Sequence, residues 1–345
     1  MAPPPARPAA SKPKTKVQRG AGPERVRRIA VCLDGSPCGE RVLPHVRAIA
    51  EVLGASVTLL HVLERGLEGA PQPDPFGWEL EREEAHRYLE RLAQAHDGAS
   101  RDVSTNVLEG RPAEQIRLWA RRNDADLTVL CTHGRSGPSE WGLASTARKL
   151  VERAPGSLLL IPASSESATP VARYQRVLVA LDGSPRAESV LPLAARLGAA
   201  QDAELILAHV VPVPELTEVG PIEAEGLELR ERLVRRNERV AQEYLDGLRA
   251  RLVGDGLRVR VVLLRGGDVR LRLARLIAEE QVDLVVISAH GRGSRTEMPY
   301  GSVAAFLLAN ATVPTWVVRP TAPRVARHAD AHPNGTLRFP SQATP

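Results

Sequence analysis

The fold is decided by a ten-residue stretch, RIAVCLDGSP at residues 28–37. The same pattern returns as RVLVALDGSP at residues 176–185. In both places an apolar run ends in the turn signal Asp-Gly-Ser-Pro. Two further matches lie downstream at similar spacings: His61-Val62 with His209-Val210, and His133-Gly134-Arg135 with His290-Gly291-Arg292. The chain is therefore an internal duplication, and such repeats decide how the rest of a sequence is interpreted.

Short apolar runs alternate with helical patterns in both copies. We expect strands at 28–33, 56–63, 102–108, 126–131 and 158–161, and again at 176–181, 203–211, 257–264, 283–288 and 314–319. Helices are expected at 37–53, 79–96, 112–123 and 145–153, and between the second set of strands. Fully apolar strands that alternate with helices are typical of a parallel sheet covered on both faces. With right-handed crossovers, the sequence predicts two tandem doubly wound five-stranded parallel sheets, an α/β fold.

The repeat sets the domain boundaries. We assign residues 25–163 to the first domain and 174–320 to the second, with a Ser/Ala/Pro linker at 164–173. The tails, 1–24 and 321–345, are rich in Pro, Ala, Ser and Thr, and we expect them to be disordered.

Charge and cysteine usage limit the function classes. The formal charge is +5, but the two tails hold eight basic and two acidic residues, so the body between them is nearly neutral. A nucleic-acid partner is therefore not expected. No apolar stretch reaches the roughly 18 residues of a membrane helix, and no secretory signal is expected. Three cysteines without metal-ligand spacing are most simply small buried residues of a reduced, cytoplasmic protein.

The candidate site lies at the strand ends, because doubly wound sheets bind ligands beyond the carboxyl ends of their strands. Asp34 and Asp182 follow the first strand of each copy. The fourth strands lead into Cys131-Thr132-His133-Gly134 and Ser288-Ala289-His290-Gly291. A helix then opens at Ala144-Ser145-Thr146 and at Gly301-Ser302-Val303. The backbone N–H groups of a helix N-terminus favour phosphate, while a carboxylate is suited to accept from amino or hydroxyl groups of a nucleoside.

These segments resemble the universal stress protein family over roughly residues 25–320. The nucleotide signature of that family is Gly-x2-Gly-x9-Gly-Ser/Thr. The second copy has Ser288-x2-Gly291-x9-Gly301-Ser302, with one substitution, and the first has Cys131-x2-Gly134-x9-Ala144-Ser145, with two. The added methyl group of Ala144 is expected to weaken binding where phosphates approach closely.

The resemblance implies an adenine nucleotide alpha hydrolase-like fold and bound ATP, with or without Mg²⁺. In the second copy it implies that the nucleotide is lined by Asp182, Val210, Ile287, Ser288, Gly291, Gly301, Ser302 and Val303. In the first copy the corresponding positions are Asp34, Val62, Leu130, Cys131, Gly134, Ala144, Ser145 and Thr146.

The family also implies a regulatory module of the stress response, with protein partners that the sequence does not identify. Its fifth strands commonly pair domains, so the resemblance implies an intramolecular pseudo-dimer through 158–161 and 315–319, and leaves a homodimer open. No P-loop, dinucleotide fingerprint or metal-site pattern occurs, and the binding segments hold no lysine. We therefore expect binding with at most slow hydrolysis. The alternatives are a nucleotide-free interaction scaffold and, with less support, an enzyme of the wider superfamily.

Several residues have a purely structural interpretation beside the functional one. The two aspartates could serve only the turn before the next helix. His61 and His209 are more simply core histidines than catalytic groups, and Arg135 and Arg292 could reach a triphosphate or remain solvated. We expect the charged segment 223–251 to be a helix with a solvated face.

Overall fold

The structure is a computed structural model that describes residues 26–64, 74–96, 102–134, 143–153, 156–164, 171–213, 224–292, 299–310 and 312–319. Both expected tails and Arg135 lie outside these residues.

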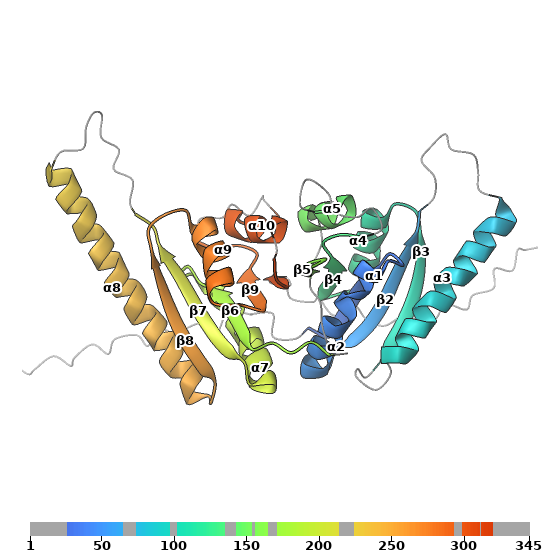
Figure 1. The fold of residues 1–345 in the computed structure, drawn as a ribbon, viewed down its shortest axis with the longest axis horizontal. Coiled ribbons are helices and arrows are strands. Elements are labelled where there is room, and N and C mark those ends of the chain that lie inside the picture. The colour runs from blue at the N-terminus through green and yellow to red at the C-terminus, as the bar shows by residue number, and fades with distance from the viewer. Residues whose placement is uncertain are drawn as a thin grey trace, which may run out of the picture.

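Strands and helices alternate in the same order in both copies (Figure 1). The first copy consists of β1 (Arg28–Leu33), α1 (Pro37–Glu40), α2 (Val42–Leu53), β2 (Ser56–Leu63), α3 (Pro75–His96), β3 (Val103–Glu109), α4 (Pro112–Arg122), β4 (Leu127–Cys131), α5 (Ser145–Arg153) and β5 (Ser157–Ile161). The second consists of β6 (Arg176–Ala180), α6 (Pro185–Glu188), α7 (Leu191–Gln201), β7 (Glu204–Val211), α8 (Ala224–Gly254), β8 (Arg258–Arg265), α9 (Val269–Glu279), β9 (Leu284–Ser288), α10 (Ser302–Ala309) and β10 (Thr315–Val318). Every strand bound lies within one residue of the sequence prediction.

All ten strands belong to one sheet, in the order β3-β2-β1-β4-β5-β10-β9-β6-β7-β8. Within each half the neighbouring strands are parallel, and the two halves meet where β5 pairs antiparallel with β10. The strand order reverses between β1 and β4, and again between β6 and β9. These are the two positions where an α/β sheet opens a crevice for a ligand.

The helix predicted over 37–53 is divided in two. Residue Arg41 separates α1 from α2, and Pro44 lies in the first turn of α2. Proline has no N–H group, so the carbonyl of Glu40 loses the partner that a continuous helix would provide. Pro192 divides α6 from α7 in the same way.

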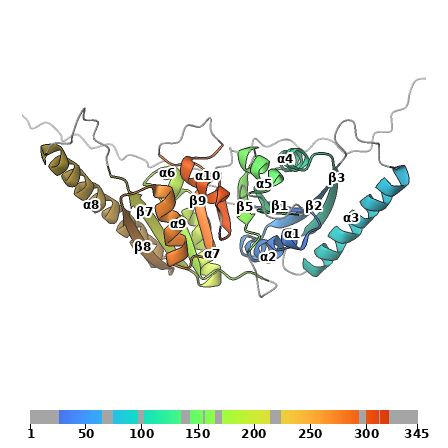
Figure 2. The ribbon, with the colours of Figure 1, turned by 45° about the horizontal axis from the view of Figure 1, so that its top comes forward.

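Two apolar layers lie on opposite faces of the sheet, as expected for a doubly wound fold. One layer joins the strands to α2, α3, α7 and α8. The other joins them to α5, α9, α10 and Ile116 of α4. Along β1, Ile29, Val31 and Leu33 belong to the first layer, because successive side chains of a strand point to opposite faces. Figure 2 shows α3 and α8 against the two outer ends of the sheet.

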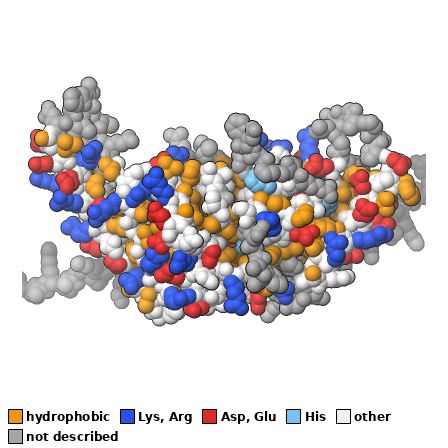
Figure 3. Space-filling view, in the orientation of Figure 1, with side chains coloured by type: hydrophobic (Ala, Val, Ile, Leu, Met, Phe, Trp, Pro, Cys, Tyr) orange, Lys and Arg blue, Asp and Glu red, His pale blue; other side chains and the backbone are white. Residues whose placement is uncertain are grey.

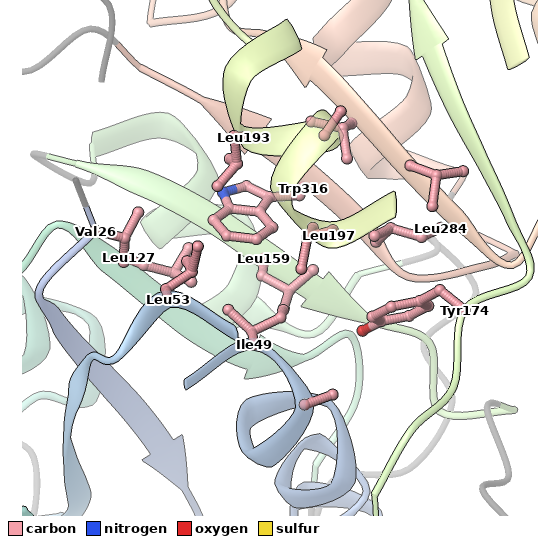
Figure 4. Close-up of a cluster of buried hydrophobic side chains, with 14 of the residues drawn as sticks. Val26, Ile49, Leu53, Leu127, Leu159, Tyr174, Leu193, Leu197, Leu284 and Trp316 are labelled. Carbon is pink, nitrogen blue, oxygen red and sulfur yellow. The ribbon is translucent and has the colours of Figure 1, made fainter. Parts of the chain in front are cut away.

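The first of these layers runs across the boundary between the domains. Trp316 of β10 is fully buried and lies among Leu159 of β5 and Leu193 and Leu197 of α7 (Figure 4). At the end of the linker, Tyr174 is also buried. The two domains therefore share a sheet and part of a core.

A second set of contacts ties the linker to the first domain. The Ala172 N–H donates to the Pro44 carbonyl at 3.0 Å. His45 Nδ1 and the Tyr174 hydroxyl lie 2.9 Å apart, with both side chains buried. The linker therefore ends in a fixed contact with α2.

The outward face of α8 is charged. Arg232 pairs with Glu228 at 3.4 Å and Arg235 with Glu231 at 2.5 Å, both one helical turn apart. Figure 3 shows basic and acidic side chains interspersed over this face of the molecule. This agrees with the expected solvated face. In the described part of the chain, no helix combines the length and apolarity needed to cross a membrane.

Candidate functional site

Each aspartate of the Asp-Gly-Ser turn lies at a point where the strand order reverses. In the second domain the Ser184 N–H donates to Asp182 Oδ1 at 2.9 Å, and Gly183 has a φ of 74° that favours glycine. The helix itself is capped by Ser184, whose Oγ accepts from the Ala187 N–H at 3.1 Å. The aspartate therefore shapes the turn but is not the cap of α6.

The second oxygen of Asp182 points to the neighbouring strand end. Its Oδ2 accepts from the Arg292 N–H at 2.5 Å. Gly291 lies directly against the same oxygen, since a Cβ atom built on Gly291 would be 2.2 Å from Asp182 Oδ2. Gly291 has no positive φ, so close approach, and not backbone conformation, requires glycine here.

The first domain repeats this contact. A Cβ atom on Gly134 would lie 2.1 Å from Asp34 Oδ2, and Asp34 Oδ1 accepts from the Ser36 N–H at 3.1 Å. In both copies, the aspartate after the first strand therefore lies directly against the glycine that follows the fourth strand.

The surroundings favour the ionised form of Asp182. Partial burial alone would raise its pKa, but hydrogen bonds from Ser184 and from the Arg292 N–H, together with the Arg292 charge, hold the pKa below its ordinary value. Asp182 is therefore an acceptor at neutral pH. The Arg292 guanidinium donates to the Gly183 carbonyl at 3.2 Å and is exposed at the rim of the site.

The glycine signature fixes the start of a helix beside the strand end. The Gly301 N–H donates to the Ala289 carbonyl at 2.8 Å, and α10 begins at the next residue. In the first domain the Ala144 N–H donates to the Thr132 carbonyl at 2.9 Å, and α5 begins at the next residue. In both domains this bond ties the residue that precedes the helix to the residue that follows the fourth strand.

Gly301 caps α10 without a side-chain hydrogen bond, at φ −66° and ψ 159°. This is ordinary extended backbone that alanine also adopts. Ala144 therefore meets no conformational obstacle, and what it adds at this position is a methyl group. The substitutions at Cys131 and Ser288 are also compatible with the backbone, since neither residue has a positive φ.

The two strand-2 histidines are held in the sheet. His61 Nδ1 lies 2.9 Å from the Leu33 carbonyl, and His209 Nδ1 lies 2.7 Å from the Leu181 carbonyl. In this geometry Nδ1 donates, and the ring ties the end of strand 2 to the end of strand 1. This supports the interpretation as core histidines.

A pocket of about 1010 Å³ opens at the strand ends of the second domain. The eight positions that the resemblance assigned to the second copy all line it, namely Asp182, Val210, Ile287, Ser288, Gly291, Gly301, Ser302 and Val303. The helix N-terminus of α10 and the carboxylate thus face one cavity, whose other walls are mainly apolar. Among the described residues of the lining, Asp182 is the one acidic residue, and Arg292 is the one basic residue apart from His209 and His290.

Sequence reasoning missed the wall that α8 provides. Asn237, Val240, Ala241 and Tyr244 line the pocket from this helix. The segment had been assigned only to a solvated face, whereas its other face turns toward the strand ends. Tyr300, buried before Gly301, was missed as well.

Tyr300 links the pocket to the domain boundary. The Arg319 guanidinium lies 4.3 Å from the centre of the Tyr300 ring and donates to the Pro299 carbonyl at 2.6 Å. The Arg319 backbone N–H donates to Ser157 Oγ of β5 at 3.1 Å. One residue therefore contacts both the pocket wall and the first domain.

The corresponding positions of the first domain differ in exposure. Leu130 and Cys131 are buried, Ser145 is exposed, and the other positions are half-buried, namely Asp34, Val62, Gly134, Ala144 and Thr146. Residues 135–142, which connect the strand end to α5, lie outside the described residues.

The chain is similar to known proteins in both sequence and structure. The profile described as the Universal stress protein family matches residues 25–162 and 173–319. Universal stress protein Rv2005c of Mycobacterium tuberculosis is 28% identical over 304 residues, covering 86% of this chain and 98% of that protein. A universal stress protein of Thermus aquaticus is 33% identical over 139 residues, covering 39% of this chain and 96% of that protein.

The structural comparison agrees on the fold. A universal stress protein from Archaeoglobus fulgidus DSM 4304 superimposes with a TM-score of 0.60 at 18% identity. The match covers 86% of this chain and 97% of that one, so it includes both domains.

Proposed function

Because the chain belongs to the universal stress protein family, we propose that its second domain binds ATP and that the protein acts as a regulatory module in a stress response. The observation that carries the proposal is the pocket between Asp182 and the N-terminus of α10. It combines an ionised acceptor, apolar walls and a helix N-terminus within one cavity.

The chemistry of the lining fits an adenine nucleotide. The carboxylate of Asp182 is suited to accept from ribose hydroxyls or the adenine amino group. The apolar side chains of Val210 and Ile287 offer contact area for the flat base. At the opposite part of the motif, the N–H groups that begin α10 and the exposed Ser302 hydroxyl are donors for phosphate oxygens.

The lining gives less support to rapid phosphoryl transfer. Such reactions depend on several groups that hold metal ions and neutralise charge on the transferred phosphate. Of the lining residues that the structure describes, Asp182 is the one carboxylate and already accepts hydrogen bonds at both oxygens, and none is a lysine. We propose that ATP is held, with or without Mg²⁺, and that occupancy is signalled through shape or through protein partners. A turnover above roughly 1 s⁻¹, the low end of ordinary enzymes, would contradict this part.

Calorimetric titration of the full chain with ATP tests the binding site. Asp182→Ala removes a charged hydrogen-bond acceptor, worth about 1.5–3 kcal/mol, so we expect ATP affinity to fall about 10- to 150-fold. Asp34→Ala is the matched variant of the first domain, and it should leave the second-domain isotherm unchanged. The number of ATP molecules bound per chain then tells whether the first domain also fills.

Three outcomes would overturn the assignment. If the wild-type chain binds no ATP, the nucleotide-free scaffold is the better description. If Asp34→Ala abolishes binding and Asp182→Ala does not, the site lies in the first domain. Equal affinities in all three proteins would place the nucleotide elsewhere.

A further inference from the structure

The three cysteines of the chain, Cys32, Cys38 and Cys131, all lie in the first domain and are free thiols. They are divided between the two faces of the sheet. Cys131 belongs to the apolar layer under α2, and Cys38 of α1 packs against that same layer. Cys32 packs against the opposite layer, so the sheet separates it from the other two.

Contacts around the strand end bring Cys38 and Cys131 together. Helix α1, which contains Cys38, packs against β4, which ends at Cys131. The Cys38 thiol lies 3.9 Å from the Ala163 carbonyl. The N–H of Ala163 donates at 3.1 Å to Oγ1 of Thr132, the residue that follows Cys131.

The carboxylate of Asp34 spans the same two segments. A Cβ atom on Gly39 would lie 2.5 Å from Asp34 Oδ1, while one on Gly134 would lie 2.1 Å from Asp34 Oδ2. Gly39 directly follows Cys38, and Gly134 comes three residues after Cys131. The backbones that carry the two thiols are therefore held against one side chain.

Burial and the neighbouring Cys38 thiol both affect the pKa of Cys131. Burial is the main cause that raises the pKa of Cys131 to about 11, and the neighbouring Cys38 thiol, as a charge and a hydrogen-bond partner, raises it further. Cys131 is buried, whereas Cys38 is partly exposed. The pair thus offers one accessible sulfur and one shielded sulfur beside it.

We propose that Cys38 and Cys131 form a reversible disulfide bond in exchange with a small-molecule disulfide. The Cys38 thiolate attacks one sulfur of the small disulfide, forms a mixed disulfide and releases one small thiolate. Cys131 then loses its proton to solvent and attacks the Cys38 sulfur, which releases the second small thiolate. The two protein thiols are oxidised, one small disulfide is reduced to two small thiols, and the two protons balance the two thiolates.

The second domain lacks this chemistry at the equivalent positions. Arg186 and Ser288 stand where the first domain has Cys38 and Cys131. The proposal does not rest on nucleotide binding, although Cys131 is one of the positions of the first-domain signature. A disulfide there would fasten α1 to the end of β4, beside Asp34, and would make the first domain responsive to oxidation.

The test uses the full chain with glutathione disulfide as the probe. After incubation, remaining thiols are alkylated and counted by intact-mass spectrometry under non-reducing conditions. We expect the three free thiols to fall to one with no glutathione retained, and reduced glutathione in excess to restore all three. Tryptic peptides 29–41 and 123–135 should be found linked.

Three single variants assign the sulfurs. Cys32→Ser removes the only other thiol from peptide 29–41 and should leave the link intact. Cys131→Ser introduces the residue that the second domain already has at this place, and should convert the link into a stable glutathione adduct on Cys38. Cys38→Ser should leave Cys131 unmodified. The proposal is overturned if wild-type protein keeps all three thiols, retains glutathione on Cys38, or loses the link in Cys32→Ser.

Discussion

The contact between Gly291 and Asp182 makes a quantitative prediction about the site. Gly291→Ala introduces a Cβ atom 2.2 Å from Asp182 Oδ2, closer than any van der Waals contact allows. Since Gly291 has no positive φ, the backbone itself can accept alanine. The whole cost must therefore come from displacing the carboxylate or the loop that carries the Arg292 N–H.

Forcing an extra methyl group into a filled position costs about 1–3 kcal/mol of unfolding free energy. That cost depends on the carboxylate being present. In an Asp182→Ala background the methyl group meets no oxygen, and the same change should cost at most about 0.5 kcal/mol, as for an unobstructed surface site. The coupling between the two substitutions is therefore expected to be about 0.5–3 kcal/mol, the range for residues in contact.

A double-mutant cycle of the full chain in urea measures this coupling, with ATP affinity determined on the same four proteins. Gly247→Ala is the matched control, because a Cβ atom there meets nothing within 4 Å on helix α8. It should raise stability by about 0.5–1 kcal/mol, the ordinary gain for alanine over glycine in a helix. Additive effects of Gly291→Ala and Asp182→Ala would refute the reasoning, because the clash would then lie elsewhere.

Two further predictions concern contacts at the domain boundary. Arg319→Leu removes the cation above the Tyr300 ring, a contact worth about 0.5–2 kcal/mol. We expect ATP affinity, measured by calorimetry, to fall about 2- to 30-fold. An unchanged affinity would show that the Tyr300 segment does not position the nucleotide. Burial lowers the pKa of His45 to about 4, so the native state disfavours the proton that the unfolded chain accepts. The unfolding free energy is therefore unaffected by His45 above about pH 6.5, and it falls as the pH drops from about 6.5 toward the folded-state pKa of about 4. His45→Gln should flatten the decline of unfolding free energy between about pH 6.5 and about pH 4, and an identical slope in both proteins would contradict the assignment.

The sequence predicted the central strands of the sheet well because β4, β5, β9 and β10 are buried throughout. A run such as Leu284-Val285-Val286-Ile287 is apolar throughout, so it can be recognised without any knowledge of its neighbours. The turn after β1 and β6 was equally readable, since Asp-Gly-Ser-Pro encodes a positive φ at glycine and a cap at serine. The break between α1 and α2 was also encoded, by Pro44, but a helical period of apolar residues on either side concealed it.

The pocket wall could not be predicted in the same way. Whether Asn237 and Tyr244 face the strand ends depends on the rotation and the angle of α8 against the sheet, and periodicity fixes neither. Arg319 contacts Tyr300, but no sequence pattern connects the two segments from which these residues come. Both features arise from tertiary packing. The sequence motif therefore identified part of the pocket lining, and the structure was needed to identify the rest.

The duplication has preserved the apolar character of the strands and the aspartate and glycine contact at their ends, but other positions at the strand ends differ between the copies. At the boundary β5 and β10 are buried throughout, and a polar or smaller residue there would disturb both domains at once, as the position of Trp316 illustrates. Apart from the two glycines that contact the aspartates, the segments after the strands include positions that face a cavity or solvent, and these are less constrained. The differences between the copies that bear on chemistry, such as Cys131 against Ser288, accordingly lie at the carboxyl edge of the sheet. One packing solution can therefore support the proposed nucleotide pocket in one half and the proposed thiol pair in the other.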